Sequence, residues 1–229
     1  SLNKGLKLAE GKYVARMDAD DIMLPNRLLL QVDFMENNPD YGMVGGWHEV
    51  INEKGKIIQK LERFTDHEHL KLQMLFSNPF MHPAITIRTN LLKQLKYSEK
   101  FELCEDYELW TRVSSLTRVA NLPHFILQYR IHGNNVSSSN RELLKNNLGV
   151  LITRELDKLE IAYTSEELVL HLAMSLGYGR NFFNTDEKLK NLNNWLEKLM
   201  TVRKISKSND TEFKKFKEKF LFRQCSISL

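Results

Sequence analysis

The sequence has little of what marks several protein classes. Its two cysteines in 229 residues, Cys104 and Cys225, lie far apart without metal-ligand spacing, so neither a disulfide framework nor a structural zinc site is indicated. Ten glycines and five prolines are too few for a collagen-like or low-complexity chain. The longest uncharged stretch in the middle of the chain, residues 72–87, is too short and too polar to cross a bilayer. We therefore expect a soluble globular protein of a reducing compartment.

The charged residues are unevenly distributed. Hydrophobic residues make up 42% of the chain and charged residues 27%, as is typical of a folded domain, and the formal net charge is +4. Residues 201–229 contain eight lysines and arginines against three acidic residues, so the basic character belongs to the tail. Nucleic acid is not the expected partner, because the main body is not basic.

The spacing of aromatic residues in the tail predicts an amphipathic helix. Phe213, Phe216 and Phe220 follow one another at i, i+3 and i+7, and lysines occupy the remaining surface. One interpretation is that the Phe stripe packs on the preceding helices. The other is peripheral contact of residues 203–223 with an anionic membrane.

Up to about residue 136, short strand patterns alternate with helical ones, which indicates an α/β body. Pro25 opens one helix, with Leu28, Val32 and Met35 expected on its buried face. Residues 65–68 form a capping-box pattern for another. A hairpin-like turn is expected at residues 52–55. Strands are expected at residues 13–17, 43–51, 56–61, 84–88 and 125–131, and helices at residues 2–9, 25–37, 66–76 and 105–116.

After a polar break at residues 137–140 the pattern becomes helical only. Thr164 to Glu167 form a second capping-box pattern. The expected helices are residues 141–159, 164–180, 185–200 and 209–222. The sequence therefore predicts an α/β domain at residues 1–137 and a helical region with a basic tail at residues 138–229.

The densest chemical feature is Asp18-Ala19-Asp20-Asp21, which lies between a strand and the Pro25 helix. Three carboxylates in four residues repel one another, and a fold that holds them together usually supplies a cation or amide donors. N-capping of the next helix by Asp20 or Asp21 is the simpler explanation, but it accounts for one aspartate only. We favour a metal and phosphate site.

Three weaker features accompany the acidic segment. Glu105 and Asp106 open a helix, where the macrodipole alone would favour them. Arg130 and His132 end a strand, and His82 lies in a loop between two prolines. Each of these histidines is as readily explained by structural hydrogen bonding or a rigid turn.

Together these segments, in this order, resemble bacterial family 2 glycosyltransferases over about residues 1–137. The resemblance implies inverting, nucleotide-sugar-dependent enzymes with a GT-A fold, a mixed sheet flanked by helices. The family's opening strand and the segments that hold uracil and ribose have no counterpart here. We therefore expect a domain incomplete at its N-terminus, with weak binding of UDP-sugar and little or no transfer by this chain alone. The segments that carry the resemblance are residues 2–31, 78–83, 105–110 and 129–132.

The resemblance also implies a role for each candidate residue. It implies that Asp20, His132 and Asp21 hold a divalent metal ion, Mn²⁺ or Mg²⁺, which stabilises the departing diphosphate. It places the donor-binding roles on Asp18, Arg130 and Asn3. Asp106 is the implied general base, Glu105 its neighbouring positioner, and His82 an acceptor-side residue.

The implied function is metal-dependent, inverting transfer of a sugar from a nucleotide-sugar such as a UDP-sugar. The acceptor would be a glycan or lipid-linked sugar in bacterial surface polysaccharide synthesis, in the cytoplasm or at the inner face of the cell membrane. One alternative is an inactive fragment or interaction module whose basic tail binds membrane or a partner protein. Nucleotidyl transfer is disfavoured, because no glycine-rich phosphate loop is present.

Overall fold

The computed structural model describes residues 1–132, 140–178 and 182–201. They form two compact units. The first comprises Ser1–Met74 and Asn78–Leu144, and the second comprises Leu75–Ser77 and the described residues from Lys145 onward. The predicted α/β and helical elements fall in the first and second units respectively, whereas the domain boundary between residues 137 and 138 stays a prediction.

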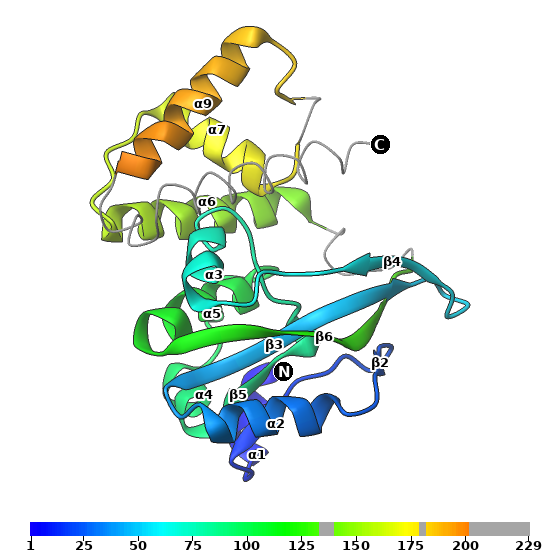
Figure 1. Ribbon diagram of the computed structural model, residues 1–229. Helices are drawn as coiled ribbons and strands as arrows, with labels where there is room; N and C mark the ends of the chain where they lie inside the picture. The colour runs from blue at the N-terminus through cyan, green and yellow to red at the C-terminus, as the bar shows by residue number, and fades with distance from the viewer. Residues whose placement is uncertain (133–139, 179–181, 202–229) are drawn as a thin grey trace. The chain divides into compact units, whose positions relative to one another are not determined.

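A mixed six-stranded sheet forms the centre of the first unit (Figure 1). Its two long strands, β3 (Tyr41–Ile51) and β6 (Arg118–Arg130), run parallel, and the other pairings are antiparallel. Because β1 and β2 lie at opposite edges, the acidic loop that joins them crosses the end of the sheet. The strand order is β1 (Tyr13–Ala15), β5 (Thr86–Arg88), β3, β6 and β2 (Ile22–Met23), with β4 (Ile57–Leu61) paired to β3.

Helices cover the sheet. Helix α2 (Arg27–Asn37) packs on one face, where Met35 contacts Val44, Ala120 and Leu122. Figure 1 shows α3 and α5 on the other side of the sheet, and both contact β6. The bounds of the remaining helices are α1 (Leu2–Leu8), α3 (His67–Gln73), the 3₁₀ turn η1 (His82–Ala84), α4 (Thr89–Leu95) and α5 (Glu105–Leu116).

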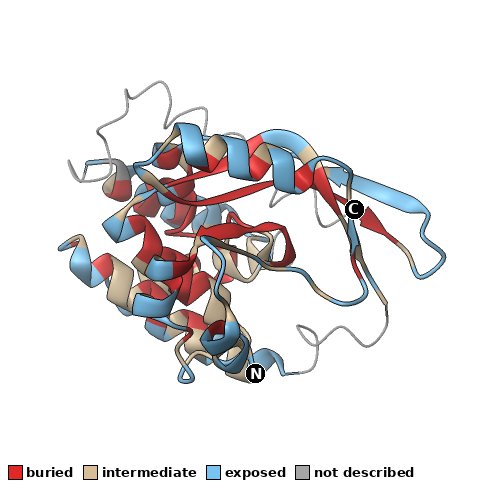
Figure 2. Cartoon of the chain, turned by 90° about the horizontal axis from the view of Figure 1, so that it is seen from below, coloured by how far each residue is buried: buried red, intermediate tan, exposed pale blue. Residues whose placement is uncertain are grey.

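Buried residues are concentrated in the central strands and the helices behind them (Figure 2), whereas β4 is largely exposed. The turn before β4 was expected from its sequence. Gly55 adopts a φ of 78°, and the Asn52 side chain accepts hydrogen bonds from the backbone amides of Lys54 and Lys56. The β3–β4 hairpin therefore projects as an arm from the sheet.

The second unit is helical, as predicted. It contains α6 (Arg141–Lys158), α7 (Ser165–Ser175) and α9 (Asp186–Thr201). The capping box at Thr164 and Glu167 is confirmed. His171 is fully buried, donates to the Leu75 carbonyl, and accepts from the Trp195 indole at 3.1 Å. The expected helix at residues 209–222 lies outside the described residues.

Two predictions for α2 are wrong. The helix begins at Arg27, because Asn26 has a φ of 65° and occupies the N-cap position. Leu28 and Val32 are exposed, and the buried face carries Arg27 and Gln31 with Met35. The buried polar side chains find backbone carbonyl acceptors in β3, in η1 and at the ends of β1 and β5, which an apolar periodicity does not reveal.

Other boundaries also differ from expectation. Asp66, rather than Thr65, caps α3 by accepting from the His69 amide, and that helix ends at Gln73. Strand β6 begins at Arg118, seven residues before the predicted start. Strand β2 and helix α4 were not predicted.

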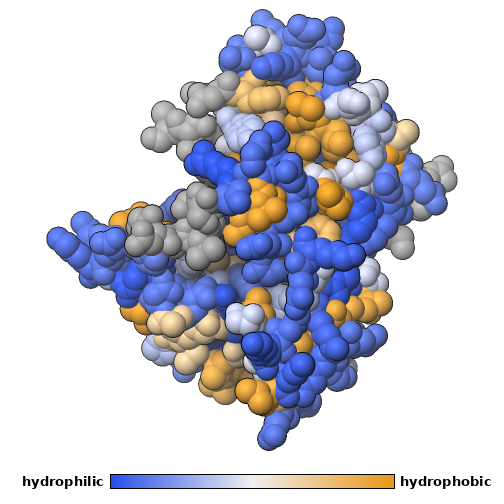
Figure 3. Space-filling model, turned by 180° about the vertical axis from the view of Figure 1, so that it is seen from behind, coloured by the Kyte–Doolittle hydropathy of each residue, from blue (hydrophilic) through white to orange (hydrophobic). Residues whose placement is uncertain are grey.

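No helix in the described part of the chain is long and apolar enough to cross a bilayer. Hydrophilic side chains interrupt the hydrophobic ones over the face shown in Figure 3.

Candidate active site

The acidic segment lies in the loop between β1 and β2. The loop is fixed at its start by the Arg16 amide, which donates to the Ile85 carbonyl at 3.0 Å. It is fixed at its end by pairing of Ile22 with Gln128 on β6. The N-capping explanation for Asp20 and Asp21 is wrong, because Asn26 occupies the N-cap position of α2. The clustered carboxylates therefore need another explanation.

Asp21 points into the protein. Its Oδ1 accepts from the Arg130 amide at 2.9 Å, whereas its buried Oδ2 has no hydrogen-bond partner among the described residues. Burial raises the pKa of Asp21 to about 6, and the charges of Asp18 and Asp20 raise it further against the Arg130 hydrogen bond. An unpartnered carboxylate oxygen of this kind favours a proton or a cation beside it.

Asp20 contacts His132, the second predicted metal ligand. Asp20 Oδ2 and His132 Nε2 are 3.0 Å apart, although 112 positions separate them in sequence. A pocket of about 480 Å³ borders His132 and is lined by Asn52, Glu53, Lys54 and Ile131. The structure thus brings two of the predicted metal ligands together beside an open space.

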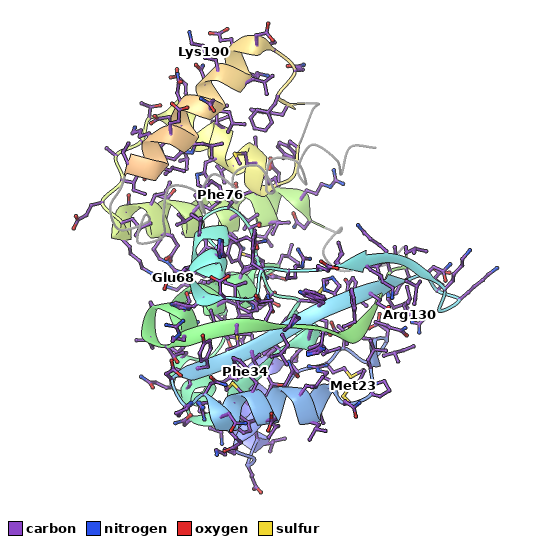
Figure 4. The ribbon with its side chains drawn as sticks, viewed as in Figure 1. Met23, Phe34, Glu68, Phe76, Arg130 and Lys190 are labelled. Carbon is purple, nitrogen blue, oxygen red and sulfur yellow. The ribbon has the colours of Figure 1, made fainter. Side chains whose placement is uncertain are left out.

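Arg130 connects the acidic loop to the β3–β4 hairpin. Its Nε donates to the Asp20 carbonyl at 2.8 Å, and its Nη1 donates to the carbonyls of Asn52 and Glu53 at 3.1 and 3.0 Å. Figure 4 shows Arg130 at the same end of the sheet as Met23 of β2. In this arrangement the guanidinium binds backbone carbonyls, and its predicted role toward the donor diphosphate stays a prediction.

The donor set of the acidic loop suits a shared metal ion. A divalent cation bound to a diphosphate needs only one or two protein ligands, because phosphate oxygens supply others. Asp20 and His132 provide such a pair, with the unpartnered Oδ2 of Asp21 in the same loop. Among the described residues, no three His, Cys, Asp or Glu side chains converge as a metal site of their own. The residues fit an ion shared with a phosphate ligand rather than an all-protein cage.

Asp106 lies in the first turn of α5 and is held by two donors. The Asn78 amide donates to its Oδ2 at 2.8 Å, and the Tyr107 backbone amide donates to its Oδ1 at 2.7 Å. Burial raises the pKa of Asp106 to about 6, and the neighbouring charge of Glu105 also raises it. A carboxylate with this pKa is ionised at neutral pH and is a stronger base than an ordinary aspartate.

His82, the predicted acceptor-side residue, is held by aromatic neighbours. Its Nε2 lies 3.0 Å from the Tyr97 hydroxyl, and its ring packs edge-to-face on Trp110. Burial lowers the pKa of His82 to about 3, and the charge of Arg16 lowers it further, so the imidazole is neutral at neutral pH. Asn3 exchanges two hydrogen bonds with the backbone of Tyr97, at 2.9 and 3.0 Å. Its predicted contact with the donor stays a prediction.

Arg16 links the two groups of candidate residues. Its Nη1 pairs with Asp18 Oδ2 at 2.5 Å. Its charge also acts on Asp21 and Asp106, where it partly opposes the rise in pKa that burial causes. Sequence reasoning assigned no role to Arg16, Asn78 or Tyr97. Two of them had a signal in the sequence: Arg16 lies two residues before Asp18, and Asn78 belongs to a segment that carries the family resemblance.

Comparison with known proteins finds a family match for the N-terminal part of the chain. A family model described as glycosyl transferase family 2 matches residues 1–96, which include the acidic loop and His82. The chain is thus similar to glycosyl transferase family 2 over these residues. The family resemblance expected from the sequence is therefore confirmed for this segment.

Curated relatives of this chain are named glycosyltransferases. An uncharacterized glycosyltransferase of Methanocaldococcus jannaschii is 37% identical over 134 residues, covering 57% of this chain and 46% of the relative. The O-antigen biosynthesis glycosyltransferase WbnJ of Escherichia coli is 36% identical over 61% of this chain and 55% of the relative. The amylovoran biosynthesis glycosyltransferase AmsE of Erwinia amylovora is 34% identical over 57% and 49%. The chain spans about half the length of these relatives.

A solved structure shares the fold. TarS 1–349 of S. aureus, crystallised with UDP-GlcNAc, superposes with a TM-score of 0.53 over 87% of this chain and 60% of that chain, at 18% identity. This likeness confirms the GT-A-like α/β fold.

Proposed function

We propose that this chain carries out metal-dependent, inverting transfer of a sugar from a nucleotide-sugar to a glycan or lipid-linked acceptor. The observation that carries the proposal is the Asp20–His132 contact, which joins the family 2 segment to the end of β6 at 3.0 Å. A fold that holds carboxylates and an imidazole at one loop, beside a hydrogen-bonded aspartate on α5, supports this chemistry. Residues 1–137 are proposed as the transferase domain and residues 138–229 as a helical region.

Asp106 is the proposed general base. Inversion requires an acceptor hydroxyl to attack the anomeric carbon on the face opposite the diphosphate, and the hydroxyl needs a base for its proton. Asn78 and the Tyr107 amide hold the two carboxylate oxygens, so the group is oriented before substrate arrives. Glu105 is the proposed positioner, because its charge keeps the proton affinity of Asp106 high.

Asp20, His132 and Asp21 are the proposed holders of Mn²⁺ or Mg²⁺. When bound, such an ion stabilises the negative charge of the departing diphosphate. Asp18 is proposed to face the donor ribose, and its pairing with Arg16 holds its carboxylate in place. Arg130 and Asn3 are proposed on the donor side, and neutral His82 is proposed to accept or donate one hydrogen bond to the acceptor.

The substrate classes follow from the named relatives. TarS was crystallised with UDP-GlcNAc, and WbnJ and AmsE are named for O-antigen and amylovoran biosynthesis. We therefore propose a UDP-sugar donor and a surface polysaccharide acceptor, with the enzyme at work in the cytoplasm or at the inner face of the membrane. Membrane contact through residues 203–223, which lie outside the described residues, is proposed from the sequence pattern alone.

A UDP-release assay tests the proposal. Because weak donor binding is expected of this chain alone, it would be incubated with a panel of UDP-sugars at high concentration. Oligosaccharide acceptors and Mn²⁺ are included, and EDTA provides the metal-free arm. We expect acceptor-dependent UDP release that EDTA and Asp20→Ala abolish. Asp33→Ala, which removes an exposed carboxylate of α2, is the control and is expected to retain activity. Release that is unaffected by both EDTA and Asp20→Ala would contradict the metal assignment.

A further inference from the structure

Arg27 is one of the most deeply buried side chains of the first unit, with 1% of its surface exposed. Its guanidinium makes no salt bridge among the described residues and binds neutral acceptors. Nη1 donates to the Pro83 carbonyl at 2.8 Å, and Nη2 donates to the carbonyls of Arg16 and Ile85 at 2.8 and 3.2 Å. A buried cation without a carboxylate is costly and needs a compensating role in the fold or in function.

The three carbonyls belong to two segments of the candidate site. Arg16 precedes the acidic loop, and its own side chain pairs with Asp18. Pro83 follows His82 in η1, and Ile85 connects η1 to β5. A single planar group therefore binds the start of the donor-side loop and the turn that carries the proposed acceptor-side histidine.

Gln31, one helical turn later, extends this connection. Its Oε1 accepts from Arg27 Nε at 3.0 Å and from the Thr86 hydroxyl at 2.8 Å. Its Nε2 donates to the carbonyls of Val44 and Ala84 at 3.1 and 2.8 Å. Gln31 thereby fixes the orientation of the guanidinium and anchors the η1 turn to β3.

We propose that Arg27 is a positioning residue that holds the acidic loop and the His82 turn in a fixed relation, and so aligns the donor and acceptor sides of the site. This inference rests on the proposed function. Lysine is a poor substitute, because one ammonium group lacks the fork geometry that reaches three carbonyls at once. Burial lowers the pKa of Arg27 to about 10, so the group stays charged at neutral pH, and the charge of Asp21 supports it.

Arg88, the last residue of β5, provides a matched control, because it also binds the backbone around α2. Its guanidinium also donates to backbone carbonyls, those of Tyr41 and Met35 at 2.8 Å and that of Asn38 at 3.4 Å. These acceptors lie at the C-terminal end of α2 and at the start of β3, and none of them belongs to the acidic loop or to the His82 turn. Loss of either arginine thus removes a comparable set of hydrogen bonds, but only Arg27 contacts the site segments.

The test compares Arg27→Lys with Arg88→Lys by two readouts. Amide hydrogen exchange is expected to quicken in residues 16–24 and 80–86 for Arg27→Lys, and in residues 35–41 for Arg88→Lys. The kcat for sugar transfer, expressed per folded molecule, is expected to fall about 10- to 100-fold for the first variant and less than about 3-fold for the second. A purely structural role would lower thermal stability in both variants and leave kcat per folded molecule unchanged.

Gln31→Ala is the second variant, for use if Arg27→Lys fails to fold. It keeps the guanidinium and removes the oxygen that orients it, so a smaller rise in exchange is expected in the same two segments. Normal exchange in residues 16–24 and 80–86, or equal kcat in the Arg27 and Arg88 variants, would overturn the proposal. Absence of UDP release by the wild-type chain would instead contradict the proposed function, while the exchange comparison would still decide the positioning role.

Discussion

Asp20 and His132 lie 3.0 Å apart, although one belongs to the β1–β2 loop and the other follows β6. The contact depends on the antiparallel pairing of β2 with β6. This pairing brings the acidic loop, which precedes β2, next to the residues that follow β6. Asp106 is held elsewhere, by Asn78 and the first turn of α5. The proposed metal ligand Asp20 and the proposed general base Asp106 are thus separately anchored and can be separately removed.

Asp20→Ala and Asp106→Asn are expected to abolish transfer for different reasons. The first removes a carboxylate that is proposed to hold the ion, and the second removes the group that is proposed to take the proton. Calorimetry with Mn²⁺ and UDP should show loss of metal-dependent nucleotide binding in Asp20→Ala only. Transfer by Asp106→Asn should fall about 10²- to 10⁴-fold, the usual contribution of a general base. Near-normal turnover in Asp106→Asn would show that the base is another group.

Asn78→Ala is expected to move the acidic limb of the pH–rate profile to higher pH. The Asn78 hydrogen bond favours the ionised form of Asp106, so its removal raises a pKa that already stands at about 6. The profile of kcat/KM against pH, measured between pH 5 and 9, checks this shift. Asn90→Ala, which removes an exposed side chain at the start of α4, is the control. An unchanged limb in Asn78→Ala would argue against Asp106 as the titrating base.

His171→Gln is expected to destabilise the protein more at pH 7 than at pH 4. Burial lowers the pKa of His171 from 6.5 to about 4, so the folded state favours the neutral ring. The neutral buried ring contributes to the free energy of unfolding above pH 6.5, and this contribution is lost as the pH falls toward 4. The difference in unfolding free energy between wild type and variant should narrow by about 3 kcal/mol over this range.

Urea unfolding at several pH values measures this difference. Trp195→Phe removes the indole donor and leaves the imidazole, so its pH dependence should resemble that of the wild type. A gap for His171→Gln that is constant with pH would contradict the neutral, buried state of the ring.

The two interpretations of the basic tail, packing of its Phe stripe and contact with an anionic membrane, predict different results with liposomes. At about 1 kcal/mol for each basic residue near an anionic surface, the net positive charge of residues 201–229 is large enough to matter. Co-sedimentation with anionic and neutral liposomes, before and after deletion of residues 203–229, is the measurement. Binding that is absent, or that survives the deletion, would leave the tail without a membrane role.

The sequence predicted the elements whose own residues determine them. Helix α5 has the predicted bounds of Glu105 and Leu116, because its acidic first turn and apolar periodicity are local signals. The β3–β4 turn was equally local. The first half of β6 was not predicted, because it contains Pro123 and a proline argues against a central strand. The structure accommodates this proline where the register of β6 with β3 is irregular, between Gly46 and Trp47.

The candidate site was predictable in its residues but not in its connections. The order of the acidic loop, Asp106 and His132 along the chain indicated one family. The roles of Asn78 and Arg27 depend on acceptors far away in sequence, such as the Pro83 carbonyl 56 positions from Arg27. A periodicity argument assigned the buried face of α2 to leucine and valine, because it counts apolar side chains and does not count distant carbonyls.

The anomeric configuration of the product tests the central claim most directly. Proton NMR of the glycan formed from a UDP-sugar with an α linkage, in the presence of Mn²⁺, reports the configuration through its anomeric coupling. A single in-line attack promoted by Asp106 predicts a β-linked product and release of one UDP for each linkage formed. An α-linked product, or no acceptor-dependent product from any UDP-sugar of the panel, would contradict it.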